Sequence, residues 1–177
     1  MNANILSSKI NQEILGFLCK HPNDSFYSSQ IAQKTDLSVG GVNQALRLLN
    51  KNNLLKADKK GRMTFYQVDT SSPVIRQFKV FRTILSLDPL VKKLQPFTEK
   101  AVLFGSCAEG TNAEDSDIDL LVVSSQKSDI NSVFTKFKCK QKIQLILKSP
   151  QEYVSLEKKE PVFFAELEKG TSLWQKV

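Results

Sequence analysis

Residues 104–119 read Phe-Gly-Ser-Cys-Ala-Glu-Gly-Thr-Asn-Ala-Glu-Asp-Ser-Asp-Ile-Asp and lie between two apolar runs. The runs Ala101–Phe104 and Leu120–Val123 have the length and composition of short buried strands. Side chains alternate between the two faces of a strand, so Asp117 and Asp119 are expected on one face at the start of the second strand. The stretch therefore predicts a strand, a tight turn and a second strand that begins with two carboxylates.

Paired carboxylates and a Gly-Ser turn together suit a metal and a phosphate. Two carboxylates on one face repel each other unless a cation lies between them, and such oxygen ligands suit Mg²⁺ that is shared with substrate phosphates. Gly105 and Ser106 supply a tight turn whose backbone N–H groups can face an anion. A neighbouring magnesium site and phosphate site are therefore expected here.

The spacing of these residues resembles a known family signature. Gly105-Ser106 is followed after ten residues by Asp117-Ile118-Asp119, with Gly110 four residues after the serine and Ser116 before the first aspartate. This pattern resembles that of the DNA polymerase β-like nucleotidyltransferases, and in particular the minimal nucleotidyltransferases of bacteria and archaea. The resemblance covers roughly residues 100–173. It implies a small mixed α/β (α+β) sheet with flanking helices.

The resemblance also implies a reaction, which is transfer of a nucleoside monophosphate from an NTP to a hydroxyl. Gly105, Ser106 and Ser116 would bind the nucleotide, and Asp117 and Asp119 would be the catalytic Mg²⁺ ligands. In the family, two metals clamp the attacking and leaving oxygens of an in-line displacement. Minimal nucleotidyltransferases often act with a small helical protein in toxin–antitoxin pairs, so a partner or substrate of that kind is implied as well.

The chain departs from the family pattern at two positions. The family's third carboxylate, on the next strand, aligns with Gln144 in the run Lys142–Leu147, and Glu109 stands where a basic residue is usual. A glutamine offers a neutral oxygen but no charge and no basic group. Two hypotheses therefore stay open: a nucleotidyltransferase directed to DNA, or a DNA-binding transcriptional regulator whose transferase-like part senses nucleotide or only forms a scaffold.

The positive charge of the chain is concentrated in its amino-terminal half. Residues 1–96 contain 14 basic and 6 acidic side chains, a difference of +8, whereas residues 97–177 contain 11 and 12, a difference of −1. A basic domain favours a polyanionic partner, most often nucleic acid.

The pattern in this half predicts three helices and a hairpin. Helices are expected over residues 8–20, from Ser28 or Ser29 to Lys34, and from a Ser38 cap to about Lys51. The third carries the apolar stripe Val42, Ala45, Leu46 and Leu49. Strands 54–57 and 63–68 follow, joined by a basic tip at residues 58–62.

This order resembles a winged helix-turn-helix domain, whose third helix enters the major groove of DNA. The side chains Asn43, Gln44 and Arg47 are then candidates for base edges, because amide and guanidinium groups match purine edges. The wing would meet phosphate or the minor groove. The full set of expected DNA-binding residues is Ser38, Asn43, Gln44, Arg47, Lys51, Lys59, Lys60 and Arg62. The alternative is a winged helix that contacts only proteins.

These patterns predict three regions. A winged helix domain is expected at residues 1–72, a helical connector at 73–96 that is interrupted near Asp88-Pro89, and a nucleotidyltransferase-like domain at 97–177. The connector is strongly apolar, so it is expected either to be buried against both domains or to form a homodimer contact. The tail, residues 150–177, reads as two short helices packed on the sheet, with Pro161 starting the second.

Composition excludes several classes of protein. No run of eighteen apolar residues is present, so no membrane span is expected, and residues 1–20 lack the features of a signal peptide. The expected location is therefore the cytoplasm. Three cysteines without paired spacing argue against a disulfide framework, and the single histidine, His21, does not support a Ser-His or Cys-His catalytic pair.

Overall fold

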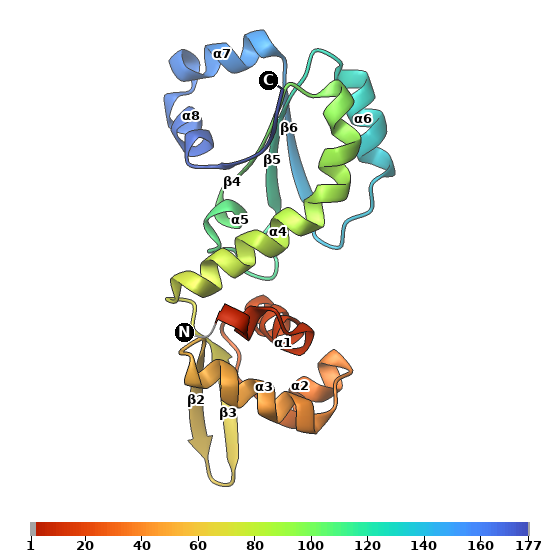
Figure 1. The fold of residues 1–177 in the computed structure, drawn as a ribbon. Helices are drawn as coiled ribbons and strands as arrows, with labels where there is room; N and C mark the ends of the chain where they lie inside the picture. Colours follow the sequence, from red (N-terminus) through yellow and green to blue (C-terminus); the bar gives the residue numbers. More distant parts are fainter. Residues whose placement is uncertain (1–2, 177) are drawn as a thin grey trace. The chain divides into compact units, whose positions relative to one another are not determined.

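The structure is a computed structural model that describes residues 3–176. The chain forms two compact units, residues 1–79 and 80–177, whose boundary falls inside helix α4 (Pro73–Leu94). Each unit has its own hydrophobic core. Figure 1 shows the helices and strands of each unit. The start of α4 contributes Ile75 and Phe78 to the core of the first unit, and its later turns contribute to the second.

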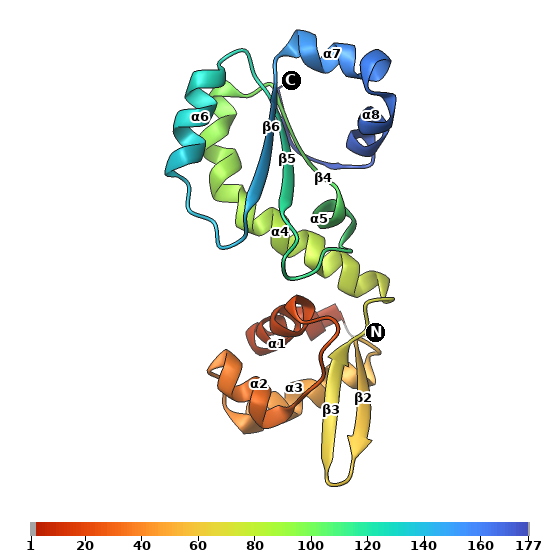
Figure 2. The same ribbon diagram turned by 180° about the vertical axis from the view of Figure 1, so that it is seen from behind.

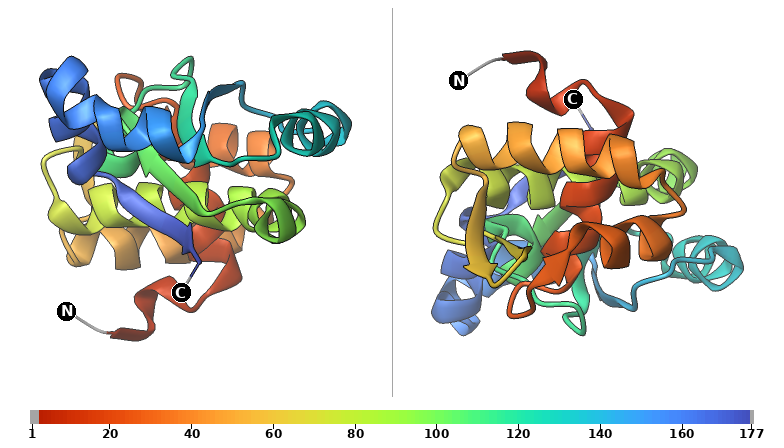
Figure 3. Two further views of the ribbon diagram at one scale, coloured as in Figure 1. Left: turned by 90° about the horizontal axis from the view of Figure 1, so that it is seen from above. Right: turned by 90° about the horizontal axis from the view of Figure 1, so that it is seen from below.

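The first unit is a winged helix fold. A short 3-10 turn, η1 (Ala3–Leu6), precedes α1 (Lys9–Lys20), β1 (Phe26–Tyr27), α2 (Ser28–Thr35), α3 (Val39–Lys51), β2 (Leu55–Lys60) and β3 (Met63–Val68). The three strands form an antiparallel sheet in the order β1-β3-β2. The right-hand panel of Figure 3 shows the helices of this unit beside the hairpin. The element order confirms the fold expected from the sequence.

Helix α3 follows its sequence pattern closely. The predicted apolar stripe Val42, Ala45, Leu46 and Leu49 is buried in the first core. Ser38 is the N-cap, and its side-chain oxygen accepts a hydrogen bond from the Gly41 N–H at 3.2 Å. Because the cap and the stripe fix where the helix starts and how it is rotated, its opposite face points away from the core.

Two local predictions in this unit were wrong. Helix α2 is capped at Tyr27, not at Ser28 or Ser29, and the Gln30 side chain accepts a hydrogen bond from the Tyr27 N–H at 3.1 Å. The hairpin tip is also shorter than expected. Strand β2 continues through Lys60, so only Gly61, with φ +61°, and Arg62 form the turn.

Helix α4 is continuous through Pro89, where an interruption was expected. Pro89 lacks the N–H that would bond to the carbonyl four residues earlier, which costs stability. Four side chains after the middle of the helix compensate, because Leu87, Leu90, Val91 and Leu94 are buried in the second unit. Figure 2 shows that the helix bends along its length, as is usual for a helix that contains proline.

The second unit is a four-stranded sheet covered on both faces. Its strands are β4 (Lys100–Phe104), β5 (Ile118–Val123), β6 (Ile143–Lys148) and β7 (Thr171–Gln175), in the order β6-β5-β4-β7. The β5–β6 pair is parallel and the other two pairs are antiparallel. The remaining elements are η2 (Gln95–Phe97), α5 (Ser106–Glu109), α6 (Lys127–Lys136), α7 (Pro150–Lys159) and α8 (Pro161–Glu168).

Alternation along the strands separates the two faces of this sheet. Leu103 and Leu120 pack in one core with α4 and α6, whereas Phe104 and Leu121 pack in another with α7 and α8. Figures 1 and 3 show α7 and α4 on opposite sides of the strands. Asp119 has the same parity as Leu121, so it belongs to the face that α8 covers.

The tail contains a strand that the sequence pattern did not reveal. Helices α7 and α8 form as predicted, and Pro161 does start the second. However, residues 171–175 then pair with β4 as an edge strand. The chain enters this strand through Gly170, where an added Cβ would lie 2.6 Å from the Leu103 carbonyl oxygen. Helix α6 was also not predicted.

Candidate functional site

Gly105 brings the turn after β4 directly against Asp119. It has φ +66° and ψ −158°, a backbone conformation that is almost restricted to glycine. A Cβ built at this position would lie 2.5 Å from Asp119 Oδ2. Phe104 pairs with Asp119 in the β4–β5 register, so the sheet itself sets this approach. The predicted Gly-Ser turn and the second aspartate are therefore neighbours in space.

The loop between the turn and the aspartates is held by its own hydrogen bonds. The Ser106 carbonyl accepts from the Thr111 N–H at 3.0 Å, and Gly110, with φ +72°, ends α5. Ser116 Oγ accepts from the Ala113 N–H at 2.8 Å, and the Ser116 carbonyl accepts from the Gln141 side chain. Ser116 thus shapes the loop, and nucleotide contacts of Ser106 and Ser116 stay predictions.

Asp119 carries negative charge that its surroundings do not neutralise. Burial, then the charge of Asp117, then the charge of Glu166 on α8 raise the pKa of the Asp119 carboxyl above its ordinary value. Each of these causes disfavours the ionised carboxylate. A cation placed at this point would relieve the repulsion, so the electrostatics favour a cation site at Asp119.

Asp117 has an internal counter-ion. Lys142 Nζ lies 2.6 Å from Asp117 Oδ2, and the lysine side chain is 78% exposed. A backbone hydrogen bond lies beside this ion pair: the N–H of Ile118, the residue after Asp117, donates to the Lys142 carbonyl at 2.9 Å. An exposed ion pair contributes little to stability, so Lys142 can exchange for another cation at low cost.

Gln144 occupies the place expected for a third carboxylate. It pairs with Asp119 in the parallel β5–β6 register, which puts both side chains on the same face. Within residues 3–176, no group of three His, Cys, Asp or Glu residues is arranged to hold a metal. Asp117 and Asp119 still fit one Mg²⁺, because this ion is commonly held by one or two carboxylates together with substrate phosphates. The residues do not supply a complete two-metal site.

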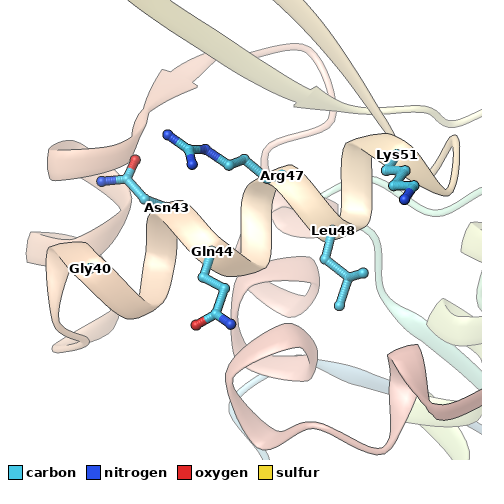
Figure 4. A pocket seen from close by; sticks show the side chains of 6 residues that line it. All are labelled: Gly40, Asn43, Gln44, Arg47, Leu48 and Lys51. Carbon is cyan, nitrogen blue, oxygen red and sulfur yellow. The ribbon is translucent and has the colours of Figure 1, made fainter.

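The outward face of α3 forms a second candidate site. A surface groove of about 430 Å³ is lined by Gly40, Asn43, Gln44, Arg47, Leu48 and Lys51. Figure 4 shows Asn43 and Arg47 along one side of the helix, and Gln44 and Leu48 along another. All four side chains are exposed and face away from the core stripe. The structure therefore presents together the four α3 residues that the sequence assigned to DNA: Asn43, Gln44, Arg47 and Lys51.

Leu48 was missed by the sequence reasoning. It belongs to an apolar residue type, yet 38% of it is exposed within the groove. The signal was available, because Leu48 follows Gln44 at the helical spacing of four and lies outside the buried stripe. The other predicted residues behave differently: Ser38 is engaged as the helix cap, while Lys59, Lys60 and Arg62 are exposed on the hairpin.

Comparison with protein families identifies the family to which most of the second unit belongs. Residues 89–176 match the family described as polymerase beta, nucleotidyltransferase. This match agrees with the Gly-Ser turn, the two aspartates and the mixed sheet described above. This part of the chain is therefore a nucleotidyltransferase domain of the polymerase β family. A search of curated proteins gave no match.

Solved structures resemble the chain only distantly. A homodimeric winged helix-turn-helix DNA-binding domain from Mycobacterium bovis is 18% identical over 48% of this chain and 74% of that one, with a TM-score of 0.39. The adhesin competence repressor of Streptococcus pyogenes is 19% identical over 51% and 68%, with a TM-score of 0.39. A protein from Sulfolobus solfataricus described as a nucleotidyltransferase is 20% identical over 57% and 87%, with a TM-score of 0.40.

Among the described residues, every helix is too short or too polar to cross a membrane.

Proposed function

We propose that the chain is a DNA-binding nucleotidyltransferase that transfers a nucleoside monophosphate from an NTP to a hydroxyl. The observation that carries this proposal is the contact between Gly105 and Asp119, with a second aspartate two residues away. Burial and the charge of Asp117 both disfavour the ionised Asp119 carboxylate, so a carboxylate at this place, beside a turn that can face an anion, favours a metal and nucleotide site.

Each residue has a distinct part in this proposal. Gly105 and Ser106 bind the triphosphate through the turn, while Asp117 and Asp119 hold Mg²⁺. When bound, Mg²⁺ would neutralise charge on the phosphates and on the leaving group. Gln144 offers only a neutral oxygen beside Asp119, so activation of the attacking hydroxyl is weak. Slow transfer is therefore expected. A small helical protein is one acceptor suggested by the family resemblance.

The presence of a glutamine, Gln144, at the position of the third carboxylate also favours a second candidate function. Without the third carboxylate, the domain can bind nucleotide without turning it over, and the chain would then act as a nucleotide-sensing transcriptional regulator. Retention of both Asp117 and Asp119 argues against a domain that only forms a scaffold. The exposed side chains Phe81 and Leu85 on α4, which are 50% and 55% exposed, suit a homodimer contact in either case.

DNA binding is proposed for the first unit through α3 and the hairpin. Arg47, Asn43 and Gln44 match the hydrogen-bonding edges of purines, and Leu48 suits the methyl group of thymine. Lys59, Lys60 and Arg62 would contact phosphates. Two rows of α3 side chains, Asn43 with Arg47 and Gln44 with Leu48, would contact base edges. Such contacts imply a preference for particular DNA sequences rather than a general affinity for DNA.

Transfer and sensing can be separated by one set of assays. Calorimetric titration of ATP and GTP with Mg²⁺ tests binding, and label from an α-³²P-labelled NTP tests transfer to the chain or to added acceptors. We expect metal-dependent binding by the wild type and its loss in Asp117→Ala/Asp119→Ala. A gain of transfer in Gln144→Asp would support the weakened transferase. Vigorous transfer that survives the double substitution would refute the assignment.

A further inference from the structure

Three exposed lysines form a charged segment next to the proposed nucleotide site. Lys136, Lys138 and Lys140, here called the lysine ridge, are all exposed. None of the three forms a salt bridge with an acidic side chain of the described part of the chain. The sequence contains no Asp or Glu between Asp129 and Glu152. Positive charge is thus concentrated here, although residues 97–177 as a whole carry a slight negative excess.

The ridge is anchored to the domain rather than loosely attached. Phe137 and Cys139 alternate with the lysines, are partly buried and pack against the core beneath α6. The Gln141 side chain then donates to the Ser116 carbonyl. These inward contacts hold the backbone on the domain surface, so the intervening lysines must project outward. In an ordinary solvated loop, by contrast, no buried side chains fix the direction in which the lysines point.

The ridge also leads directly to the aspartate pair. Two residues after Lys140, Lys142 forms its ion pair with Asp117. Gln141 contacts the residue that precedes Asp117. A ligand held along the ridge is therefore brought next to the proposed magnesium and nucleotide site.

The chemistry of the ridge favours phosphate over protein. Lysine is depleted in protein–protein interfaces, which rely on aromatic residues and arginine at their cores. The apolar residues of this segment, Phe137 and Cys139, are turned inward and leave no apolar anchor for a protein partner. Lysine binds phosphate as a point charge, and closely spaced lysines suit a ligand that repeats its negative charge.

We infer that the lysine ridge binds the phosphodiester backbone of a nucleic acid strand at the edge of the second unit. This surface is additional to α3 and the hairpin of the first unit. It does not depend on whether the transferase reaction occurs, because the contacts are electrostatic and involve no Mg²⁺ ligand. The backbone can belong to RNA or to DNA, and the two are distinguished by the test.

The test uses the full chain with the winged helix surface weakened by Arg47→Ala/Lys59→Ala/Lys60→Ala. In this background, fluorescence anisotropy measures the binding of a labelled 20-nucleotide RNA and of a single-stranded DNA of the same sequence. The ridge variant is Lys136→Ala/Lys138→Ala/Lys140→Ala. Its matched control is Lys158→Ala/Lys159→Ala/Lys169→Ala, which removes the same charge from exposed positions elsewhere in the unit.

We expect the ridge variant to lose affinity by about tenfold or more, while the control changes by less than about twofold. Each phosphate contact on a single strand contributes about 0.7 to the slope of log K against log salt, so loss of three contacts should reduce the slope by about 2. The charge-retaining variant Lys136→Arg/Lys138→Arg/Lys140→Arg should keep the affinity, because the three positive charges remain.

Equal losses in the ridge variant and the control would overturn the inference, as would failure of both the RNA and the DNA strand to bind. Selective loss in the ridge variant supports it with either strand, and the preference between RNA and DNA identifies the source of the backbone. The transferase proposal is judged separately by nucleotide titration, so the two can fail independently.

Discussion

The two candidate sites are built in different ways. The proposed DNA-binding face comes from a single helix, α3, whose cap and buried stripe fix the direction of its outward side chains. The aspartate site is assembled from the turn after β4, the start of β5 and strand β6. Sheet register joins these segments, together with the Lys142–Asp117 ion pair and the hydrogen bond from the Gln141 side chain to the Ser116 carbonyl. A site on one helix tolerates local change, whereas a site shared by three segments depends on each of them.

The largest effect is expected when a proposed Mg²⁺ ligand is removed. Asp117→Asn keeps the shape of the side chain but removes its charge. Loss of an outer-shell partner already costs 10–100-fold in metal affinity, so loss of a ligand should weaken Mg²⁺-dependent NTP binding by about 100-fold or more. Calorimetry should show this loss while DNA affinity is unchanged. Equal damage to both activities would mean that the two sites are not separate.

The reciprocal change on α3 should be smaller. Arg47→Ala removes one exposed guanidinium that matches a guanine edge, which costs about 1–3 kcal/mol of DNA binding. Anisotropy with a duplex selected from a random library should detect this loss, and nucleotide titration should show none. If selection enriches no sequence and Arg47→Ala binds DNA normally, the first unit serves another purpose.

Glycines in the two units provide a matched pair for stability. Gly105→Ala places a Cβ against Asp119 Oδ2 and strains a backbone with φ +66°, so we expect a loss of about 1–3 kcal/mol in the free energy of unfolding. Gly40→Ala meets no atom within 4 Å and sits in a helix, so a gain of up to about 1 kcal/mol is expected. Urea denaturation measures both. A neutral Gly105→Ala would contradict the close approach.

A methyl-deletion experiment sharpens the assignment of Leu48. If Leu48 packs against a thymine methyl, then replacing that thymine by deoxyuridine should cost about 0.8 kcal/mol, or roughly fourfold in affinity. The cost should disappear in Leu48→Ala, because the methyl then has no partner. The control is deoxyuridine at a thymine outside the enriched site. Equal sensitivity in both proteins would exclude the contact.

The smallest effect concerns the charge of Asp119 in the absence of metal. Its pKa is raised in the folded chain, so folding takes up protons and stability falls as pH rises from the ordinary value, 3.8, through the raised one. Asp119→Asn should therefore be more stable than the wild type at neutral pH. Thermal melting without Mg²⁺ should show this difference shrink below about pH 3.8, where both states are protonated. A difference that is constant with pH would exclude this electrostatic cause.

The α3 face and the aspartate site also differ in how much of each could be predicted from the sequence. Periodicity alone located the α3 stripe and its outward residues, because one helix fixes their geometry. Spacing and family resemblance located Gly105, Asp117, Asp119 and the position of Gln144. Neither could reveal Lys142 on Asp117 or Glu166 near Asp119, since those neighbours come from segments that register and helix packing bring together. Pro89 misled the helix prediction because burial outweighed a local penalty.

The pairing of β4 with β7 has a kinetic consequence. It joins residues 100–103 to residues 171–175, so the sheet cannot be completed until a long intervening segment has ordered. Contacts between residues that are distant in sequence slow folding, because the entropy of loop closure is lost before the contacts stabilise the chain. The hairpin of β2 and β3 closes over a two-residue turn and faces no such delay. Refolding should therefore show a fast phase from the first unit and a slower one from the second.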